Sequence, residues 1–319
     1  MPIDEVKLPN FFLVGAPKVG TTSLNDHLDQ HPQIYMSPLK EPMYFAEELR
    51  PEHMAGEVRA KTEQLMVELR KYLDSPPYAK RMGGYISEWE DYCRLFAGAR
   101  HELAIGEAST MYLWSKTAAA RIAARIPHAK IMMILRDPAD RVFSKYRQMA
   151  SVPNYGKTFQ QHLEAEQAHK EKDKIGMEYP SLDLGFYSWQ LQRYRQHFPA
   201  EQIRTWLYED TRSENFIREV YEFLGVDSGF RPDRSKRHLQ QQVPRAPGFN
   251  RLLRQVGITQ TLRRIMPEGA RGPLRKLIFK PRSAVQMTPA ERAMLVEFYR
   301  QDVRKLEEML GRDLSAWLR

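Results

Sequence analysis

The sequence predicts an α/β fold of three layers, in which a central parallel sheet is flanked by helices on both faces. Two observations lead to this prediction. Short apolar runs alternate with helical patterns along the chain, as in strand–helix–strand units. The apolar runs are nearly continuous and do not alternate with polar residues, which is typical of parallel strands buried on both faces.

The first predicted strand, FFLV, leads into a loop that contains glycine, and the helix after it is expected from Thr22 to Gln30. His31-Pro32 ends that helix because proline cannot continue it. The run KIMMIL is the clearest strand of all. The complete set of predicted strands covers residues 11–14, 33–36, 103–106, 130–135 and 203–208.

The 319 residues are predicted to form one domain, since neither an internal repeat nor a low-complexity tract divides the chain. Two polar segments, 50–92 and 151–184, are interpreted as insertions beside the functional site. Near the C-terminus, Thr288-Pro289-Ala290-Glu291 is a capping box with proline at the first helical position. The apolar face of the helix that follows is expected to contain Leu295, Phe298, Leu306 and Leu310.

Composition narrows the class of protein. The single cysteine, Cys93, excludes an intrachain disulfide and an all-cysteine metal site. The first residues lack the basic start of a signal peptide, and no run approaches the roughly 20 apolar residues of a membrane span. These features predict a soluble, cytoplasmic protein. The net charge of +9 favours an anionic partner, such as a nucleotide, an acidic glycan, nucleic acid or a lipid surface.

The segment GAPKVGTTSL joins the first strand to the first helix. Gly15 and Gly20 have the separation of the two glycines in the P-loop, G-x-x-x-x-G-K-[ST], whose backbone N–H groups bind phosphate. Thr21 occupies the position of the P-loop lysine, and the cation lies inside the loop at Lys18. We predict a loop that binds a phosphoryl anion; the alternative is a turn whose glycines serve geometry alone.

A cation also follows the strand KIMMIL. Arg136 stands where an ATPase usually has an aspartate that holds magnesium. Its planar guanidinium suits a second, monoesterified phosphate, and Ser144 in the next helix could donate a hydroxyl to the same anion. The alternative is a surface ion pair between Arg136 and Asp137 or Asp140.

Both segments resemble motifs of the sulfotransferases that use 3′-phosphoadenosine 5′-phosphosulfate (PAPS), in particular the bacterial and carbohydrate-type members. GAPKVGTTSL resembles their 5′-phosphosulfate loop, and RDPADRVFSKY resembles their 3′-phosphate-binding segment. The resemblance implies a P-loop-like fold that needs no metal and converts PAPS to adenosine 3′,5′-bisphosphate (PAP). It implies that Lys18 contacts the sulfuryl group and that Arg136 and Ser144 hold the 3′-phosphate. The implied contacts to the 5′-phosphate come from Val19, Gly20, Thr21, Thr22 and Ser23.

A third segment supplies the candidate base. KEPMYF resembles the K/N-E-x-x-[FYH]-F segment of the carbohydrate and bacterial members, in which the glutamate is the proposed base. The reaction needs a group that takes the proton of the acceptor hydroxyl and a cation near the leaving phosphate. We therefore expect Glu41 and Lys18 to be catalytic, with Lys40 beside the acceptor. The alternative is that Glu41 is a solvated acid next to Lys40.

Further acceptor contacts are expected at two other segments. GEASTMY matches the family pattern G-E-x-[ST]-P-x-Y except that Thr110 replaces proline. Glu107 and Ser109 are predicted to line the crevice at the strand ends. Tyr187, in a segment that resembles the family's G-x-Y, is assigned either to the acceptor pocket or to the core. The expected acceptor is a hydroxyl of a carbohydrate, glycolipid or natural product.

The segment between residues 231 and 282 is strongly basic. Its first part, RSKRHLQQQVPRAPGF, lies where related enzymes close a loop over the nucleotide, so Arg237 and Arg245 are predicted to contact a phosphate. The amphipathic part that follows fits a donor clamp, a dock for an anionic acceptor, peripheral contact with an anionic membrane, or a packed helix with solvated charges. The sequence leaves these alternatives open, as it does the choice between monomer and homodimer.

Two other functions compete with sulfuryl transfer. A P-loop kinase or NTPase is disfavoured by Thr21 in place of lysine and by Arg136 in place of a magnesium-binding acid. A non-enzymatic module that binds PAP or nucleic acid would use the positive charge, but no basic-aromatic recognition motif is present, so nucleic acid is not an expected partner.

Overall fold

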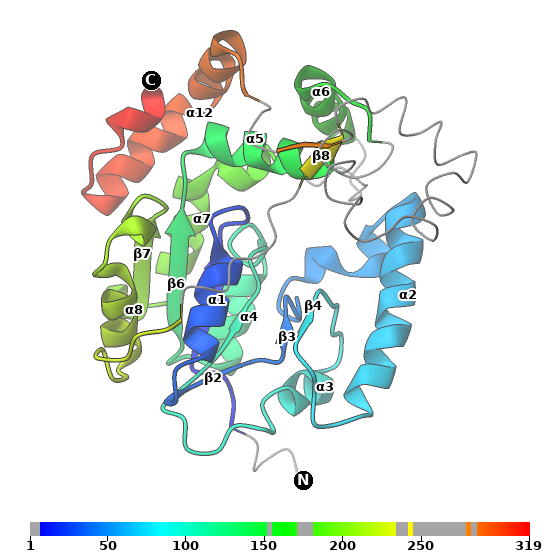
Figure 1. The fold of residues 1–319 in the computed structure, drawn as a ribbon, viewed down its shortest axis with the longest axis vertical. Helices are drawn as coiled ribbons and strands as arrows, with labels where there is room; N and C mark the ends of the chain where they lie inside the picture. Colours follow the sequence, from blue (N-terminus) through cyan, green and yellow to red (C-terminus); the bar gives the residue numbers. More distant parts are fainter. Residues whose placement is uncertain (1–6, 152–154, 171–180, 234–241, 245–278, 282–285) are drawn as a thin grey trace, which may run out of the picture.

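The computed structural model describes residues 7–151, 155–170, 181–233, 242–244, 279–281 and 286–319. It contains a five-stranded parallel sheet with the strand order β2-β5-β1-β6-β7. Helices cover both faces of this sheet (Figure 1). The predicted α/β class, with a central parallel sheet between two layers of helices, is confirmed.

All five predicted strands are present, with small shifts at their ends. They are β1 (Phe11–Gly15), β2 (Ile34–Met36), β5 (Ala104–Ala108), β6 (Lys130–Leu135) and β7 (Ile203–Leu207). The third predicted strand was placed too early, because Leu103 is exposed and precedes β5. The strand continues instead through Glu107 to Ala108, which brings a carboxyl group into the interior.

The helices form the outer layers. One layer contains α1 (Thr21–Asp29) and α8 (Phe216–Leu224), where the Tyr221 hydroxyl lies 3.5 Å from the His27 carbonyl oxygen. The other contains α4 (Ala118–Arg125) and α7 (Tyr187–Arg195), which contact each other (Figure 1). The helix α5 (Pro138–Met149) follows β6 directly and packs against α12 (Pro289–Leu310).

The strand order places β1 between β5 and β6, so the segments after these three strands meet at one edge of the sheet. Hydrogen bonds tie the segments together: Ser109 N donates to Leu13 O at 3.2 Å, and Ala16 N donates to Ile134 O at 2.7 Å. Ligands of doubly wound sheets bind at such an edge, outside the carboxyl ends of the strands.

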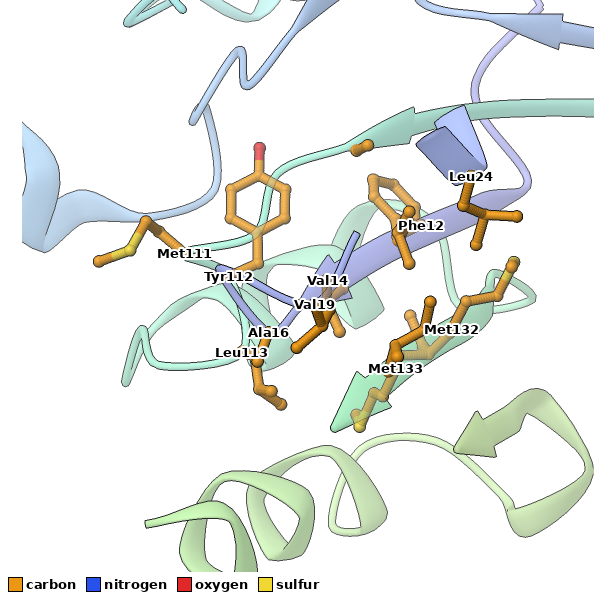
Figure 2. Packing of buried hydrophobic residues seen from close by; sticks show 14 of the residues in the cluster. Phe12, Val14, Ala16, Val19, Leu24, Met111, Tyr112, Leu113, Met132 and Met133 are labelled. Atoms are coloured by element: carbon orange, nitrogen blue, oxygen red, sulfur yellow. The ribbon is translucent and has the colours of Figure 1, made fainter. Parts of the chain in front are cut away.

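The core of the sheet extends into the loop after β1. Phe12 and Val14 of β1 are fully buried, and Val19 of the loop belongs to the same apolar cluster (Figure 2). Burying a valine side chain stabilises a fold by about 1.5–3 kcal/mol. Val19 therefore anchors the loop, and only its backbone remains for a ligand.

The two segments interpreted as insertions contain secondary structure of their own. Residues 50–92 include α2 (Gly56–Leu73), which lies well to one side of the main sheet (Figure 1), and most of α3 (Trp89–Arg94). A small parallel pair, β3 (Leu39–Lys40) and β4 (Arg81–Met82), connects this region to the site. The second segment contains α6 (Phe159–Lys170). Their assignment as insertions beside the acceptor, and the single-domain organisation, stay predictions.

The C-terminal helix begins as predicted but buries a different face. The Thr288 hydroxyl accepts from Glu291 N, and the Glu291 carboxylate accepts from Thr288 N, which completes the capping box. The expected apolar face was wrong at Phe298, which is 41% exposed, while Leu310 is half-buried. The buried residues of α12 are Leu295, Val296, Tyr299, Asp302, Val303 and Leu306.

The remaining elements are short. An antiparallel pair joins β8 (Gln242–Pro244) to β9 (Phe279–Pro281). Within the described ranges, no helix is both long enough and apolar enough to cross a membrane. The single-turn helices are η2 (Glu47–Leu49), η3 (Pro51–His53), η4 (Asp183–Gly185), η5 (Ala200–Gln202), η6 (Asp210–Arg212) and η8 (Ser315–Leu318).

Candidate active site

The loop between β1 and α1 has the backbone shape that an anion site needs. Gly20 precedes the first residue of α1 with φ of 87°, a left-handed conformation that favours glycine. Gly15 is packed so closely that an added Cβ would lie 2.6 Å from Leu113 Cβ. Lys18 also adopts a positive φ of 73°, which is uncommon for a residue with a side chain. The N–H groups at the start of α1 thus face the edge of the sheet where β1 ends.

The predicted donor residues of α1 differ in exposure. Thr21 is buried, Thr22 is half-buried and Ser23 is exposed. All three lie in the first turn of α1, where backbone N–H groups have no helical carbonyl partner. Their contact with a 5′-phosphate stays a prediction.

Arg136 lies immediately after β6 and contacts the loop. Its Nη1 donates to the carbonyl oxygen of Lys18 at 3.4 Å, and its guanidinium lies 4.7 Å from the centre of the Tyr208 ring. The two motifs that the sequence predicted to act together are therefore adjacent in space. Arg136 Nε is buried without a hydrogen-bond partner, a state that is costly unless a ligand supplies an acceptor.

The alternative prediction for Arg136, an ion pair, is also found in part. Arg136 Nη2 lies 3.3 Å from Asp140 Oδ2, but Asp140 is 48% exposed, and exposed pairs contribute little. Asp137 pairs instead with Arg292 and caps α5 through the N–H groups of Ala139 and Asp140. The pair with Asp140 leaves the guanidinium able to bind an anion.

A cavity of about 490 Å³ opens between α5 and the start of α12. Three arginines line it, Arg136, Arg147 and Arg292, against the single acid Asp140. Burial, and next the charge of Arg136, lowers the pKa of Arg147, and Arg147 Nε is buried without a partner. Sequence reasoning missed Arg147 and Arg292. A signal for Arg147 was available, because it follows the predicted Ser144 by one helical turn.

Ser144 lies within α5 and is 7% exposed. It shares α5 with Arg147, and Arg136 precedes the helix by two residues. Its role at a 3′-phosphate stays a prediction. Arg237 and Arg245, predicted to complete the donor site, lie outside the described residues.

The candidate base, Glu41, is held firmly at the opposite side of the β1 loop. Its backbone has a φ of 63°, and its N–H donates to Ala108 O at 2.9 Å. Its carboxylate accepts hydrogen bonds from Lys40 Nζ at 2.7 Å and from Thr110 N at 2.7 Å. The alternative of a solvated acid beside Lys40 fits in part: the ion pair exists, but the Glu41 side chain is only 14% exposed.

A buried carboxyl group lies beneath Glu41. Glu107 is fully buried and accepts hydrogen bonds from Tyr92 Oη at 3.0 Å and from Ser109 Oγ at 2.8 Å. Burial raises the pKa of Glu107 to about 7, and the nearby charge of Glu41 acts in the same direction. Ser109 Oγ in turn accepts from Met43 N at 3.3 Å. These contacts fix the segment that carries Glu41.

The four residues predicted to contact the acceptor are all buried. Lys40 is 7% exposed, Glu107 and Tyr187 are 0% exposed, and Ser109 is 1% exposed. The expectation that Glu107 and Ser109 line an open crevice is not met, because both side chains bond to each other beneath the Glu41 segment. Burial raises the pKa of the Tyr187 phenol to about 12, which agrees with the alternative of a core tyrosine, although its buried hydroxyl has no hydrogen-bond partner among the described residues. Lys40 directs its ammonium group at Glu41.

This edge of the sheet combines cations that can bind an anionic donor with a carboxylate that can accept a proton. In the part of the chain that the structure describes, no cluster of His, Cys, Asp and Glu has an arrangement that could hold a metal ion. The site presents an N–H cradle with Lys18 at its centre, Arg136 on one side and a desolvated carboxylate on the other.

Comparison with known proteins agrees with this geometry. A solved sulfotransferase from Alicyclobacillus acidocaldarius superposes with a TM-score of 0.72 and 30% identity, over 98% of this chain and all of that one. Human bifunctional heparan sulfate N-deacetylase/N-sulfotransferase 2 is 26% identical over 98% of this chain. Rat carbohydrate sulfotransferase 15 is 26% identical over 69% of it.

The chain spans 31% of the human relative and 44% of the rat relative, so it corresponds to a part of each. The model of the sulfotransferase family matches residues 9–230, which include the loop at Lys18, Glu41 and Arg136. The predicted family and its P-loop-like fold are thereby confirmed. This chain belongs to the sulfotransferase family.

Proposed function

We propose that this protein transfers a sulfuryl group from PAPS to a hydroxyl of a glycan-type acceptor and releases PAP. One observation carries the proposal: Arg136 Nη1 lies 3.4 Å from the carbonyl oxygen of Lys18. The contact joins two anion-binding motifs at one edge of the sheet. A nucleotide with two separate phosphate esters fits such a pair of cationic sites. The phosphates of a nucleoside triphosphate are contiguous and need only one binding loop.

The donor would be held from both ends. The N–H groups of Gly20, Thr21 and Thr22 would bind the 5′-phosphate at the start of α1. Arg136, with its unpartnered Nε, would bind the 3′-phosphate together with Ser144. Lys18, inside the loop, would lie beside the oxygen that joins phosphorus to sulfur.

The transfer can be written with these groups alone. Glu41 accepts the proton of the acceptor hydroxyl as the acceptor oxygen forms its bond to sulfur. The bond between sulfur and the 5′-phosphate oxygen breaks, and its electron pair stays on that oxygen. Lys18 stabilises the negative charge that develops there. A positioned general base contributes typically 10²–10⁴-fold to such a rate.

The proposed acceptor class draws on the relatives. One is named for heparan sulfate and another for a carbohydrate, so a saccharide is the first acceptor to test.

Calorimetric titration tests the donor assignment without any acceptor. PAP should bind in the presence of EDTA, and ATP with or without magnesium should fail to displace it. Tight magnesium-dependent ATP binding with no PAP binding would instead support the kinase or NTPase alternative.

Turnover tests the transfer itself. The protein is incubated with PAPS and a chitosan hexasaccharide, whose units carry hydroxyl and amine groups, and mass spectrometry detects the sulfated sugar. Glu41→Gln should abolish product formation while PAP binding is retained. Equal turnover by Glu41→Gln and the wild type would refute the assigned base.

A further inference from the structure

Thr110 contacts the candidate base as closely as Lys40 does, and it does so with two donor groups. It is the second residue after β5, is 7% exposed and lies 69 positions from Glu41 in the chain. Its N–H donates to Glu41 Oε2 at 2.7 Å. Its hydroxyl donates to the same carboxylate, at 3.1 Å from Oε1 and 3.4 Å from Oε2.

Neither bond is available to proline, the residue that the family pattern G-E-x-[ST]-P-x-Y has at this position. Proline lacks the backbone N–H and carries no hydroxyl. The change from proline to threonine therefore adds both a main-chain and a side-chain donor to the carboxylate of Glu41. Hydrogen bonds to ionised groups are shorter and stronger than neutral ones.

The backbone around Glu41 explains why additional donors matter. Glu41 and Met43 have φ values of 63° and 58°, a left-handed conformation that costs on the order of 1–3 kcal/mol for each such residue. Hydrogen bonds to the segment after β5 hold them there. Glu41 N donates to Ala108 O, and Met43 N donates to Ser109 Oγ. Thr110 adds the contact that fixes the side chain as well as the main chain.

The donors are distributed unequally over the two carboxylate oxygens. Oε1 accepts from Lys40 Nζ at 2.7 Å and from the Thr110 hydroxyl, which fills both of its lone pairs. Among the described residues, Oε2 accepts one close bond, from Thr110 N, and a longer contact of 3.4 Å from the Thr110 hydroxyl, which lies nearer Oε1. Oε2 is thus the less saturated of the two oxygens and the better placed to take the proton of an acceptor.

We propose that Thr110 is a positioning residue that orients Glu41 and selects Oε2 as the oxygen that takes the acceptor proton. This inference rests on the proposed role of Glu41 as the base. It goes further by naming the residue that aims the base and the atom that reacts.

Three substitutions separate the two bonds. Thr110→Ser keeps both donors, Thr110→Val removes the hydroxyl and keeps the N–H, and Thr110→Pro removes both. With PAPS and the chitosan hexasaccharide, kcat should be near wild type for Thr110→Ser and about tenfold lower for Thr110→Val. It should be about a hundredfold lower for Thr110→Pro, since each tenfold loss corresponds to about 1.4 kcal/mol of transition-state stabilisation. The KM for PAPS and the affinity for PAP should not change.

A matched control is Thr62→Val in α2, which removes another buried threonine hydroxyl, one that bonds to the Val58 carbonyl oxygen. This control should retain wild-type kcat. If Thr110→Val also keeps wild-type kcat while Glu41→Gln is inactive, the positioning role is wrong and the proposed base stands. If Glu41→Gln keeps wild-type turnover, the assigned base is refuted and this inference fails with it, while sulfuryl transfer itself stands; a wild type that binds no PAP would count against the proposed function.

A spectroscopic measurement tests the contact without turnover, which covers the case in which the hexasaccharide is not an acceptor. The backbone amide of Thr110, bonded to a carboxylate, should give a downfield proton resonance in a ¹H–¹⁵N spectrum of the whole chain. Glu41→Ala should move that resonance upfield, with Thr62 as the unaffected reference. An unchanged Thr110 resonance overturns the proposal.

Discussion

At the scale of single residues, the two cations of the donor site have different tasks, and substitution should separate them. Lys18 lies in the loop where the leaving phosphate is proposed to develop charge, so its contribution belongs to the transition state. Lys18→Ala should lower kcat by several orders of magnitude and change PAP affinity far less, as measured by turnover and calorimetry. An equal loss in kcat and in PAP affinity would show that Lys18 serves binding alone.

Arg136 should behave in the opposite way, because its proposed partner phosphate does not react. Arg136→Ala is expected to weaken PAP binding by about 10–100-fold, the value of a charge-assisted hydrogen bond of about 1.5–3 kcal/mol. Binding of 5′-AMP, which lacks the 3′-phosphate, should change little. Wild-type PAP affinity in Arg136→Ala would refute the assignment.

Some of these residues could be assigned from the sequence and others could not, for a physical reason. Lys18, Glu41 and Arg136 each follow or lie within a local pattern that fixes their place at a strand end. Thr110 contacts Glu41, which lies 69 positions away in the chain, and Glu107 contacts Tyr92 of α3. No local sequence pattern encodes either contact. Glu107 was assigned to the correct strand end, but its complete burial could not be predicted, since burial depends on what covers the strand.

At the scale of elements, α5 and the residue two positions before it bring two arginines to one cavity, where the half-exposed Asp140 offsets only part of their charge. Arg147 follows Ser144 by one turn and faces the cavity that Arg136 also lines. Two guanidinium groups with unpartnered Nε atoms in one cavity repel each other until an anion enters. The element therefore favours an anion more than either residue does alone.

This arrangement predicts a contribution from Arg147 to donor affinity. Arg147→Ala should weaken PAP binding several-fold in calorimetry and reduce its salt dependence. Arg218→Ala, which removes an exposed arginine of the surface pair with Glu222 on α8, is the matched control and should have no effect. If both variants bind PAP like the wild type, Arg147 takes no part in the site.

The start of a helix could be predicted where a local capping motif defines it. The face that a helix buries could be predicted less well, because it depends on packing against other elements. The capping box of α12 needs only Thr288 and Glu291, and it was found from sequence. The buried face of α12 depends on how the helix rotates against α5 and α7, which moved Phe298 to the surface and Tyr299 into the core.

The N-cap of α12 should matter for stability in its own right. Thr288→Ala removes the hydroxyl that accepts from Glu291 N and should lower the free energy of unfolding by about 1 kcal/mol. Urea unfolding followed by circular dichroism measures this change. Thr288→Ser, which retains the hydroxyl, should stay close to the wild type.

At the scale of the whole molecule, the fold could be predicted because parallel strands buried on both faces have a nearly continuous apolar sequence. The three central strands, β1, β5 and β6, are almost entirely buried, whereas the edge strands β2 and β7 are buried only in part. The order of the strands in the sheet was not predicted, since it depends on long-range pairing such as β2 with β5. That pairing decides which loops meet, and hence where the site lies.

The global stability of this protein should depend on pH through two buried carboxyl groups. Burial raises the pKa of Glu107, and separately that of Glu166, to about 7 from an ordinary value near 4.5. Between these values the two groups bind more protons in the folded state than in the unfolded state, so their contribution to the free energy of unfolding falls as pH rises from about 4.5 to about 7. Above that window these two groups contribute no further change.

Urea unfolding at pH 5, 6, 7 and 8 measures the effect, and variants assign it. Glu107→Gln keeps a hydrogen-bonding group of the same size but cannot ionise, so its stability should decline less steeply with pH than that of the wild type. Glu166→Gln should remove a separate part of the decline, because the two groups lie in different contacts, with Ser109 and with Ser181 respectively. Exposed Glu63→Gln is the control and should follow the wild-type curve. If Glu107→Gln shows the same pH dependence as the wild type, Glu107 is already ionised inside the folded chain at pH 5, and the network that holds the Glu41 segment would then carry a second negative charge.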